Sequence, residues 1–167
     1  GVIAYPTESV FGLGCDPFNL GAVQKILAIK KRPINKGLII LVSDIQQALP
    51  FIQPPSSQQI NRITTPQKRA VTWLMPCLAE VSPLLRGQFN TLAVRLTQHP
   101  IARAICQHTN NALVSTSCNI GGKPELCHTT SVRNHMKLKV DWVVSGQCGG
   151  QAPSQIIDLS NDRILRN

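Results

Sequence analysis

Short apolar runs of strand length recur along the whole chain and set its predicted framework. A continuous run such as Leu38–Val42 is typical of a strand that is buried on both faces. Runs of this kind predict strands at Gly1–Tyr5, Leu38–Val42, Val71–Met75, Leu92–Leu96, Ala112–Ser115 and Trp142–Val144. Two further runs, Ile156–Leu159 and Arg163–Leu165, are expected to pair across the turn at 160–162.

Segments with helical spacing lie between these runs. From Ala22 to Lys31 apolar residues recur on one face, and Pro33 stops the helix. Asp44 is expected to cap a short helix that ends at Leu49, because its side chain can accept from the first free backbone N–H groups. Other helices are predicted up to about Thr64, from Pro100 onward, and over Thr130–Met136.

Strands and helices therefore alternate, but without the strict regularity of βαβ units. This pattern predicts an α/β (α+β) domain built around a mixed sheet, with functional loops at the ends of strands. A length of 167 residues suits one domain over residues 1–167. Because Gly1–Tyr5 has the composition of a strand already under way, we expect an N-terminal element to be missing before it.

The chain is strongly basic. It has 17 Lys and Arg against 8 Asp and Glu, a formal net charge of +9. Such an excess attracts nucleotide phosphates, RNA or an acidic surface, although it also serves general solubility. Aromatic residues are only 4% of the chain, which argues against a nucleic-acid binder built on rows of stacking rings.

The six cysteines form no CxxC pair and have no zinc-finger spacing, so we expect reduced thiols and predict no metal ligands among the side chains. The sequence shows no signal peptide and no apolar run of membrane-spanning length, which favours a cytoplasmic protein with no membrane partner.

Three segments have the composition of polar binding loops. The first, Tyr5–Gly14, offers the hydroxyl of Thr7 and two glycines, yet taken alone its composition favours a structural turn over a binding loop. The second, Lys30–Gly37, concentrates four cations at a helix end, where they could grip phosphate or simply favour the helix C-terminus. The third, Ser115–Gly122, combines hydroxyls, an amide and glycines that suit an oxyanion.

Taken together and in this order, these segments resemble the YrdC-like family of threonylcarbamoyl-AMP synthases, the TsaC type in bacteria. The resemblance covers nearly the whole chain and is carried by Ala4–Glu8 with Phe11–Asp16, Lys30-x-Arg32-Pro with Lys36–Gly37, Thr91–Arg95 with His99–Pro100, Ser115–Asn119 with Gly122, Gly149–Gly150, and Pro153–Asp158. The chain departs from the family at Gln67–Thr72, where a Trp-Pro-Gly-Pro-like stretch is usual, and at Cys118, where alanine is usual.

The resemblance implies a strongly twisted mixed sheet flanked by helices, with a basic concave cavity. It also implies a nucleotidyltransferase that joins L-threonine, bicarbonate or CO2 and ATP into threonylcarbamoyl-adenylate and pyrophosphate. The product serves the modification of adenosine beside the anticodon of tRNA. Implied partners are therefore ATP carried with Mg²⁺, downstream tRNA threonylcarbamoyl transferase proteins and, as a direct ligand, tRNA.

The same resemblance assigns roles to individual residues. Lys30 and Arg32 are expected to bind the triphosphate, and Ser117 and Asn119 to hydrogen-bond phosphate or ribose; these four form the expected catalytic set. The other implied contacts are Thr91 and Ser154 for the nucleotide, and Arg95, Thr7 and Ser115 for threonine.

Two alternatives remain open from the sequence. A non-catalytic module that binds RNA or tRNA would explain the charge, but it would not need the polar loops. An enzyme that uses carbamoyl phosphate on the same fold normally has a long multidomain chain with zinc-finger parts, which the absence of CxxC pairs disfavours.

Overall fold

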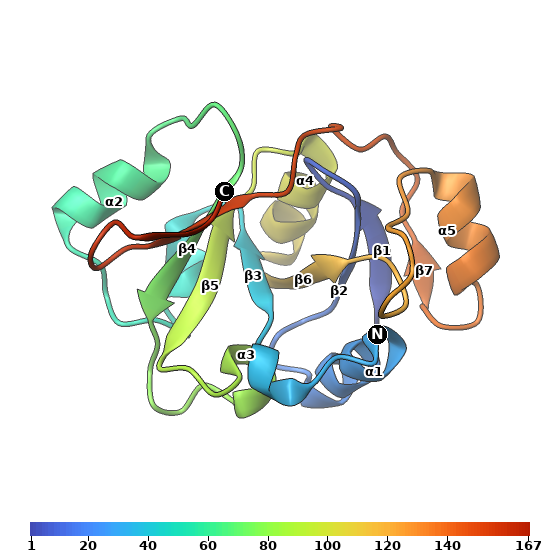
Figure 1. Cartoon of the computed structure of the whole chain (residues 1–167), viewed down its shortest axis with the longest axis horizontal. Helices are drawn as coiled ribbons and strands as arrows, with labels where there is room; N and C mark the ends of the chain where they lie inside the picture. Colours follow the sequence, from blue (N-terminus) through green and yellow to red (C-terminus); the bar gives the residue numbers. More distant parts are fainter.

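Nine strands form one mixed sheet in the computed structural model, which describes residues 1–167 (Figure 1). Across the sheet the strand order is β7-β1-β2-β6-β3-β5-β4-β8-β9. Three of its neighbouring pairs are parallel, namely β1·β7, β3·β5 and β4·β8, and the others are antiparallel. The strand bounds are β1 Ile3–Pro6, β2 Phe11–Gly14, β3 Ile39–Val42, β4 Val71–Pro76, β5 Thr91–Leu96, β6 Leu113–Ser117, β7 Trp142–Val143, β8 Gln155–Asp158 and β9 Ile164–Arg166.

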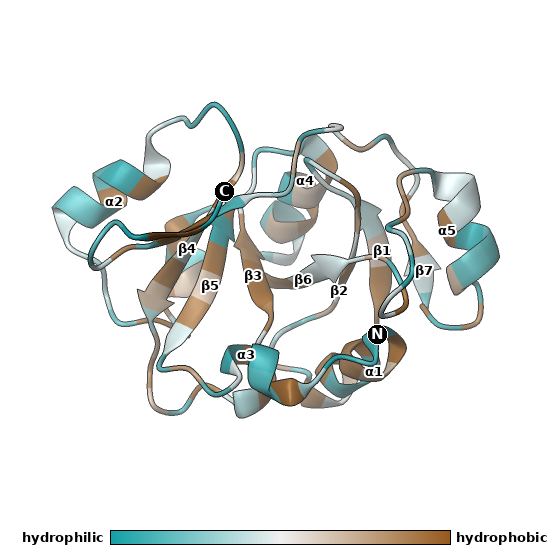
Figure 2. Cartoon of the chain, in the orientation of Figure 1, coloured by the Kyte–Doolittle hydropathy of each residue, from teal (hydrophilic) through white to brown (hydrophobic).

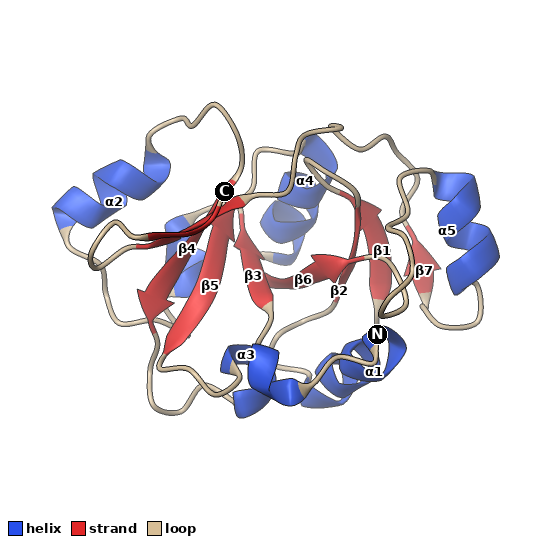
Figure 3. Cartoon of the chain, in the orientation of Figure 1, coloured by secondary structure: helices blue, strands red, loops and turns tan.

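Five α-helices and two 3₁₀ helices connect the strands (Figure 3). Their bounds are α1 Leu20–Lys30, α2 Ser57–Thr64, α3 Pro83–Arg86, α4 Pro100–Thr109, α5 Thr129–Met136, and 3₁₀ turns at Ile34–Lys36 and Ile45–Ala48. The predicted cap is confirmed, because the Asp44 carboxylate accepts from the Gln46 amide at 2.8 Å. None of the helices has both the length and the hydrophobicity needed to cross a bilayer.

Alternate residues of the central strands enter two separate hydrophobic clusters. Ile40, Val42 and Val114 belong to the large cluster, which also holds the buried faces of α1, α3 and α5. Leu41 and Leu113 point the other way and pack against Ala102 and Cys106 of α4. Strand β3 is brown along its length in the hydropathy view, as expected for a strand that is covered on both faces (Figure 2). The mixed α/β architecture predicted from the sequence is confirmed.

The prediction of a loop through Gly14 is wrong beyond Val10, because Phe11–Gly14 is strand β2. It pairs antiparallel with β1 on one side and β6 on the other. The strand approaches its neighbours so closely that a Cβ on Gly14 would lie 2.5 Å from the Val114 carbonyl oxygen. Two glycines in four residues carry little strand propensity, so tertiary pairing and not local preference forms β2.

A long connection carries the chain back across the sheet after β7. It passes over the upper edge in Figure 1, from the β1–β7 side to β4, where β8 begins. There the β8–β9 hairpin forms as predicted, with Ile157 opposite Ile164. As a result, Ser154, which is late in the sequence, lies against Thr72 of β4, and Arg166 lies against Ser154.

Candidate active site

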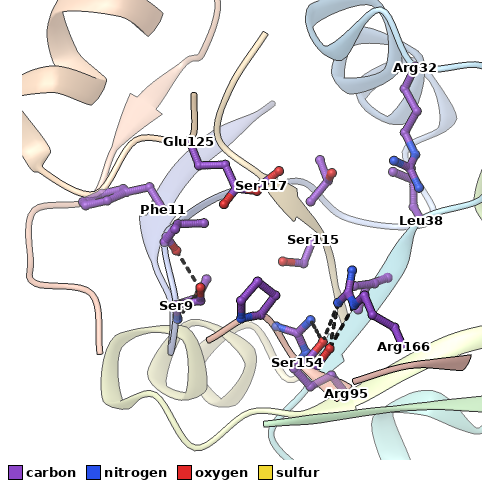
Figure 4. Close-up of a pocket in the computed structure, with 15 residues that line it drawn as sticks. Ser9, Phe11, Arg32, Leu38, Arg95, Ser115, Ser117, Glu125, Ser154 and Arg166 are labelled. Carbon is purple, nitrogen blue, oxygen red and sulfur yellow. Dashed lines mark hydrogen bonds between the residues drawn. The ribbon is translucent and has the colours of Figure 1, made fainter. Parts of the chain in front are cut away.

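A polar cavity lies on the face of the sheet that α4 leaves partly uncovered. Its volume is about 180 Å³, and its walls come from the β1–β2 turn, the end of α1, strands β3, β5 and β6, and the β8–β9 hairpin (Figure 4). Alternation along the strands explains which residues point into it: Ser115 and Ser117 share one face of β6, while Val114 enters the core. The cavity is smaller than the roughly 300–1,000 Å³ of typical ligand pockets, so it suits an amino acid or one end of a nucleotide.

Arg95 is the most buried cation of the cavity, at 9% exposed. Its Nε donates to Thr72 Oγ1 at 3.0 Å, and its Nη2 donates to Ser154 Oγ at 2.7 Å. The Thr72 and Ser154 hydroxyls are themselves 2.8 Å apart. These contacts hold the guanidinium in one orientation at the floor of the cavity (Figure 4), as a forked partner for a carboxylate must be held.

Glu8 lies behind Arg95 and compensates its charge. One carboxylate oxygen, Oε1, accepts from Thr97 Oγ1 at 2.7 Å and from the Gln98 amide at 3.0 Å. The other, Oε2, lies 4.0 Å from Arg95 Nη1 and has no hydrogen bond of its own. Burial alone would raise the pKa of Glu8, but the Thr97 and backbone hydrogen bonds and the Arg95 charge outweigh it and hold the pKa below its usual range.

Replacement of this carboxylate should therefore change the pH dependence of stability. We expect Glu8→Gln to lower the free energy of unfolding by about 1–3 kcal/mol at pH 7, because it leaves Arg95 without a counter-charge. A depressed pKa stabilises the fold above the unfolded value of about 4.3, and that contribution is lost as pH falls through the lower folded value. Urea unfolding at pH 7 and below pH 4 should show that the difference in free energy of unfolding between wild type and variant becomes smaller in acid. Exposed Glu80→Gln should show no gap at either pH.

Lys30 clamps the loop after β6. The residue is only 7% exposed, and its ammonium donates to the Ser117 carbonyl at 2.6 Å, to Ser117 Oγ at 3.1 Å, and to Asn119 Oδ1. Since an ammonium has three N–H groups, all of its donors are used. Burial, followed by the nearby charge of Arg32, lowers the pKa of Lys30. The sequence grouped Lys30, Ser117 and Asn119 as one site, and the structure brings them into direct contact.

Arg32, two residues further along, lies on the cavity wall. Its Nε donates to the Gly37 carbonyl at 2.9 Å, and its Nη2 donates to the Lys36 carbonyl at 3.4 Å. No hydrogen bond within the chain uses Nη1. Figure 4 shows the side chain descending from the end of α1 toward the cavity, opposite Arg95. Of the two cations of the Lys30-x-Arg32 motif, Lys30 thus contacts the loop after β6, whereas Arg32 lines the cavity.

The remaining predicted residues occupy different positions. Thr7, Ser115 and Ser154 line the cavity. The Thr7 hydroxyl donates to the Val10 carbonyl at 2.7 Å and so closes the β1–β2 turn. Thr91 does not line the cavity: it begins β5, four residues before Arg95 and on the same face, which puts it roughly 13 Å away.

Sequence reasoning missed three residues of this site. Arg166 on β9 donates to the Ser154 carbonyl from Nη2 at 2.8 Å and from Nε at 3.1 Å. Thr72 anchors Arg95, and Glu125 is the carboxylate on the cavity wall. No motif in the sequence marks Arg166, and only the β8–β9 hairpin reveals its place. Thr72 could have been found, since it is the one hydroxyl residue within the otherwise apolar predicted strand Val71–Met75.

Three guanidinium groups, six hydroxyls and one exposed carboxylate line this cavity, a set of groups that suits an anionic ligand. No group of three or more His, Cys, Asp or Glu side chains is placed to hold a metal ion. The fold and the cavity thus define an α/β protein with a basic, hydroxyl-lined cavity at the face of a mixed sheet.

The chain belongs to the Sua5/YciO/YrdC family. The family, described under the heading of telomere recombination, matches residues 1–167. Among its relatives, a protein of Photobacterium profundum named threonylcarbamoyl-AMP synthase is 42% identical over 99% of this chain and 91% of its own. A protein of Idiomarina loihiensis with the same name is 43% identical, over 100% of this chain and 91% of its own.

Solved structures agree with this assignment. P. abyssi Sua5, crystallised with L-threonine, superposes with a TM-score of 0.83 at 26% identity over 96% of this chain. This chain spans only 47% of that protein. E. coli YciO superposes with a TM-score of 0.82 at 25% identity over 100% of this chain and 82% of its own.

Proposed function

We propose that this chain is a threonylcarbamoyl-AMP synthase, which joins L-threonine, bicarbonate and ATP into threonylcarbamoyl-adenylate with release of pyrophosphate. The observation that carries the proposal is the convergence of Arg32, Arg95 and Arg166 on one small cavity lined with hydroxyls. Relatives that are 42–43% identical over almost the whole chain carry this name, and a structural neighbour was crystallised with L-threonine.

The chemistry requires positioning and charge neutralisation more than a protein nucleophile. The threonine amine takes up bicarbonate and loses water to become a carbamate. A carbamate oxygen then attacks the α-phosphorus of ATP, and the bond to pyrophosphate breaks. Because both reacting groups belong to substrates, the protein needs to align them and to stabilise the charge on the phosphate oxygens.

The threonine subsite is assigned to the floor of the cavity. Arg95 would bind the α-carboxylate with the N–H groups that Thr72 and Ser154 leave free, and Arg166 would add a second cation nearby. Thr7 and Ser115, which also line the cavity, would hydrogen-bond the amine and the hydroxyl.

The nucleotide is assigned to the side of the cavity near α1. Arg32 would bind the triphosphate directly, whereas Lys30 would act through the Ser117–Asn119 loop that it clamps. Ser117, Asn119 and Ser154 would contact phosphate or ribose. Thr91, which lies outside the cavity, would be reached only by the far part of the nucleotide. Mg²⁺ would arrive on the triphosphate, with Glu125 as the one carboxylate of the wall able to hold it or its waters.

The product would pass to the proteins that transfer the threonylcarbamoyl group to tRNA. ATP and tRNA are both cytoplasmic, so we place the reaction in the cytoplasm. The +9 charge would also let the surface bind tRNA directly.

A single assay tests the proposal. We expect pyrophosphate release from MgATP to require L-threonine and bicarbonate together, with the mass of threonylcarbamoyl-adenylate in the product. L-serine, which lacks the methyl group, should be used less well. If a folded chain binds tRNA tightly but releases no pyrophosphate under these conditions, the protein is instead an RNA-binding module.

A further inference from the structure

Three cysteines from separate segments meet beside the cavity. Cys118 follows Ser117 and is completely buried, Cys148 is half-buried, and Cys127 is exposed. Burial raises the pKa of Cys148, and the nearby Cys127 raises it a little further. Cys148 in turn slightly raises the pKa of the buried Cys118. None of these thiols has a part in the proposed reaction.

Backbone pairing puts two of these cysteines opposite each other. An antiparallel bridge joins His128 to Gln147. The Thr129 hydroxyl and Gly146 follow the same register on one side of the bridge, and continuing it by one step on the other side would put Cys127 opposite Cys148. Residues opposite each other in antiparallel strands have Cα atoms about 4.5–5.5 Å apart and side chains on the same side. This separation lies within the roughly 4.4–6.8 Å that a disulfide spans.

We propose that Cys127 and Cys148 are a dithiol site that forms a reversible disulfide with a low-molecular-weight disulfide as oxidant. The exposed thiolate of Cys127 attacks the oxidant, forms a mixed disulfide and releases one small thiolate. The thiolate of Cys148 then attacks the sulfur of Cys127 and releases the second. Two protein thiols lose two electrons and two protons, and the oxidant is reduced to two small thiols.

The buried third cysteine does not compete. Burial raises the pKa of Cys118 to about 12, so its thiolate is scarce at neutral pH, and the side chain is inaccessible to the oxidant. Cys148 is only half-buried and lies near the exposed thiol of Cys127, which makes it the resolving partner.

The disulfide would join two segments that flank the β1–β2 turn. On one side, the Phe11 amide donates to the Leu126 carbonyl at 2.9 Å. On the other, the Gly149 amide donates to the Thr7 carbonyl at 3.0 Å, and a Cβ on Gly149 would lie 2.7 Å from the Glu8 carbonyl oxygen. A covalent bond between these segments would restrain the rim of the cavity around Thr7. We therefore expect oxidation to slow turnover, a consequence that rests on the proposed function.

The experiment treats the chain with oxidised glutathione at pH 8, alkylates the remaining thiols and identifies linked peptides by mass spectrometry. We expect a Cys127–Cys148 peptide, with four of the six thiols still alkylated. Cys148→Ser should stop at a glutathione adduct on Cys127, and Cys127→Ser should form neither product. Cys77→Ser, a buried cysteine of another strand region, should keep the link. Pyrophosphate release by oxidised wild type should fall several-fold and recover with dithiothreitol, whereas Cys127→Ser should be unaffected.

Several results would overturn the proposal. A stable glutathione adduct on Cys127 of the wild type, a link to Cys118 or a disulfide between two chains would each show that the pair is wrongly placed. A Cys127–Cys148 disulfide that leaves the rate of pyrophosphate release unchanged would show that the bond does not restrain the cavity. The linkage is read by mass alone, so it stands or falls separately from the proposed activity.

Discussion

Arg32→Ala should lower the rate of pyrophosphate release by about 10²–10³-fold, the loss expected when one charge-stabilising donor is removed from a transition state. The reason is geometric: Arg32 is the cation on the α1 side of the cavity whose Nη1 no group within the chain uses. Because negative charge grows on the departing pyrophosphate, kcat should fall more than KM for ATP rises. Steady-state kinetics at saturating threonine and bicarbonate measures both constants.

Two variants make this prediction specific. Arg32→Lys keeps the charge but loses the fork, so its rate should lie between those of wild type and Arg32→Ala. Arg103→Ala removes the same charge from the exposed face of α4 and should keep wild-type kinetics. The loss of the Arg32 bond to the Gly37 carbonyl should cost only about 1 kcal/mol of stability. An Arg32→Ala rate within twofold of wild type would contradict the assignment.

Arg95→Ala should have the largest effect on the folded state, lowering the free energy of unfolding by about 3–5 kcal/mol. Removal of one partner of a buried ion pair leaves the other charge uncompensated, and the Arg95 and Glu8 side chains are only 10% and 6% exposed. The Thr72 and Ser154 hydroxyls would lose their donor as well. Urea unfolding followed by circular dichroism measures the change.

The double variant Arg95→Ala/Glu8→Gln isolates the charge. It should be more stable than Arg95→Ala alone, since it removes the orphaned carboxylate. If the double variant is instead less stable by the sum of the two single losses, the two residues do not interact.

Threonine binding is best measured on Arg95→Lys, which keeps a cation opposite Glu8. A lysine cannot reproduce the forked contact, so we expect the affinity for L-threonine in calorimetry to fall by at least about tenfold. Arg86→Lys, at the end of α3 and away from the cavity, is the matched control. Unchanged affinity in Arg95→Lys would move the carboxylate site away from Arg95, and Arg166 would be the next residue to test.

The division of roles between Lys30 and Arg32 changes how the Lys30-x-Arg32 motif is understood. Two cations so close in sequence suggest a joint grip on the triphosphate. The structure instead uses all three donors of Lys30 on Ser117 and Asn119, while Arg32 lies on the cavity wall. Lys30 thus holds the loop after β6 in place, and its expected contact with the triphosphate stays a prediction.

The sequence by itself determined the elements whose signals are local. Continuous apolar runs such as Leu38–Val42 predicted strands, because a strand covered on both faces excludes polar residues. Asp44 and Pro100 marked helix starts, because caps and N-terminal prolines act within one turn. The resemblance to the YrdC-like family also assigned Arg32, Arg95 and Ser115 to one site, and all three line the same cavity.

Only the tertiary structure decided the features that depend on partners distant in the chain. Strand β2 exists because β1 and β6 pair with it, although its own glycines disfavour a strand. Glu8 is a counter-charge only because β5 brings Arg95 behind it, and Arg166 reaches the cavity only through the β8–β9 hairpin. Likewise, the approach of Cys127 to Cys148 depends on the bridge between His128 and Gln147. The physical reason is common to all of these: local preference acts over a few residues, whereas pairing and charge compensation depend on distance in space.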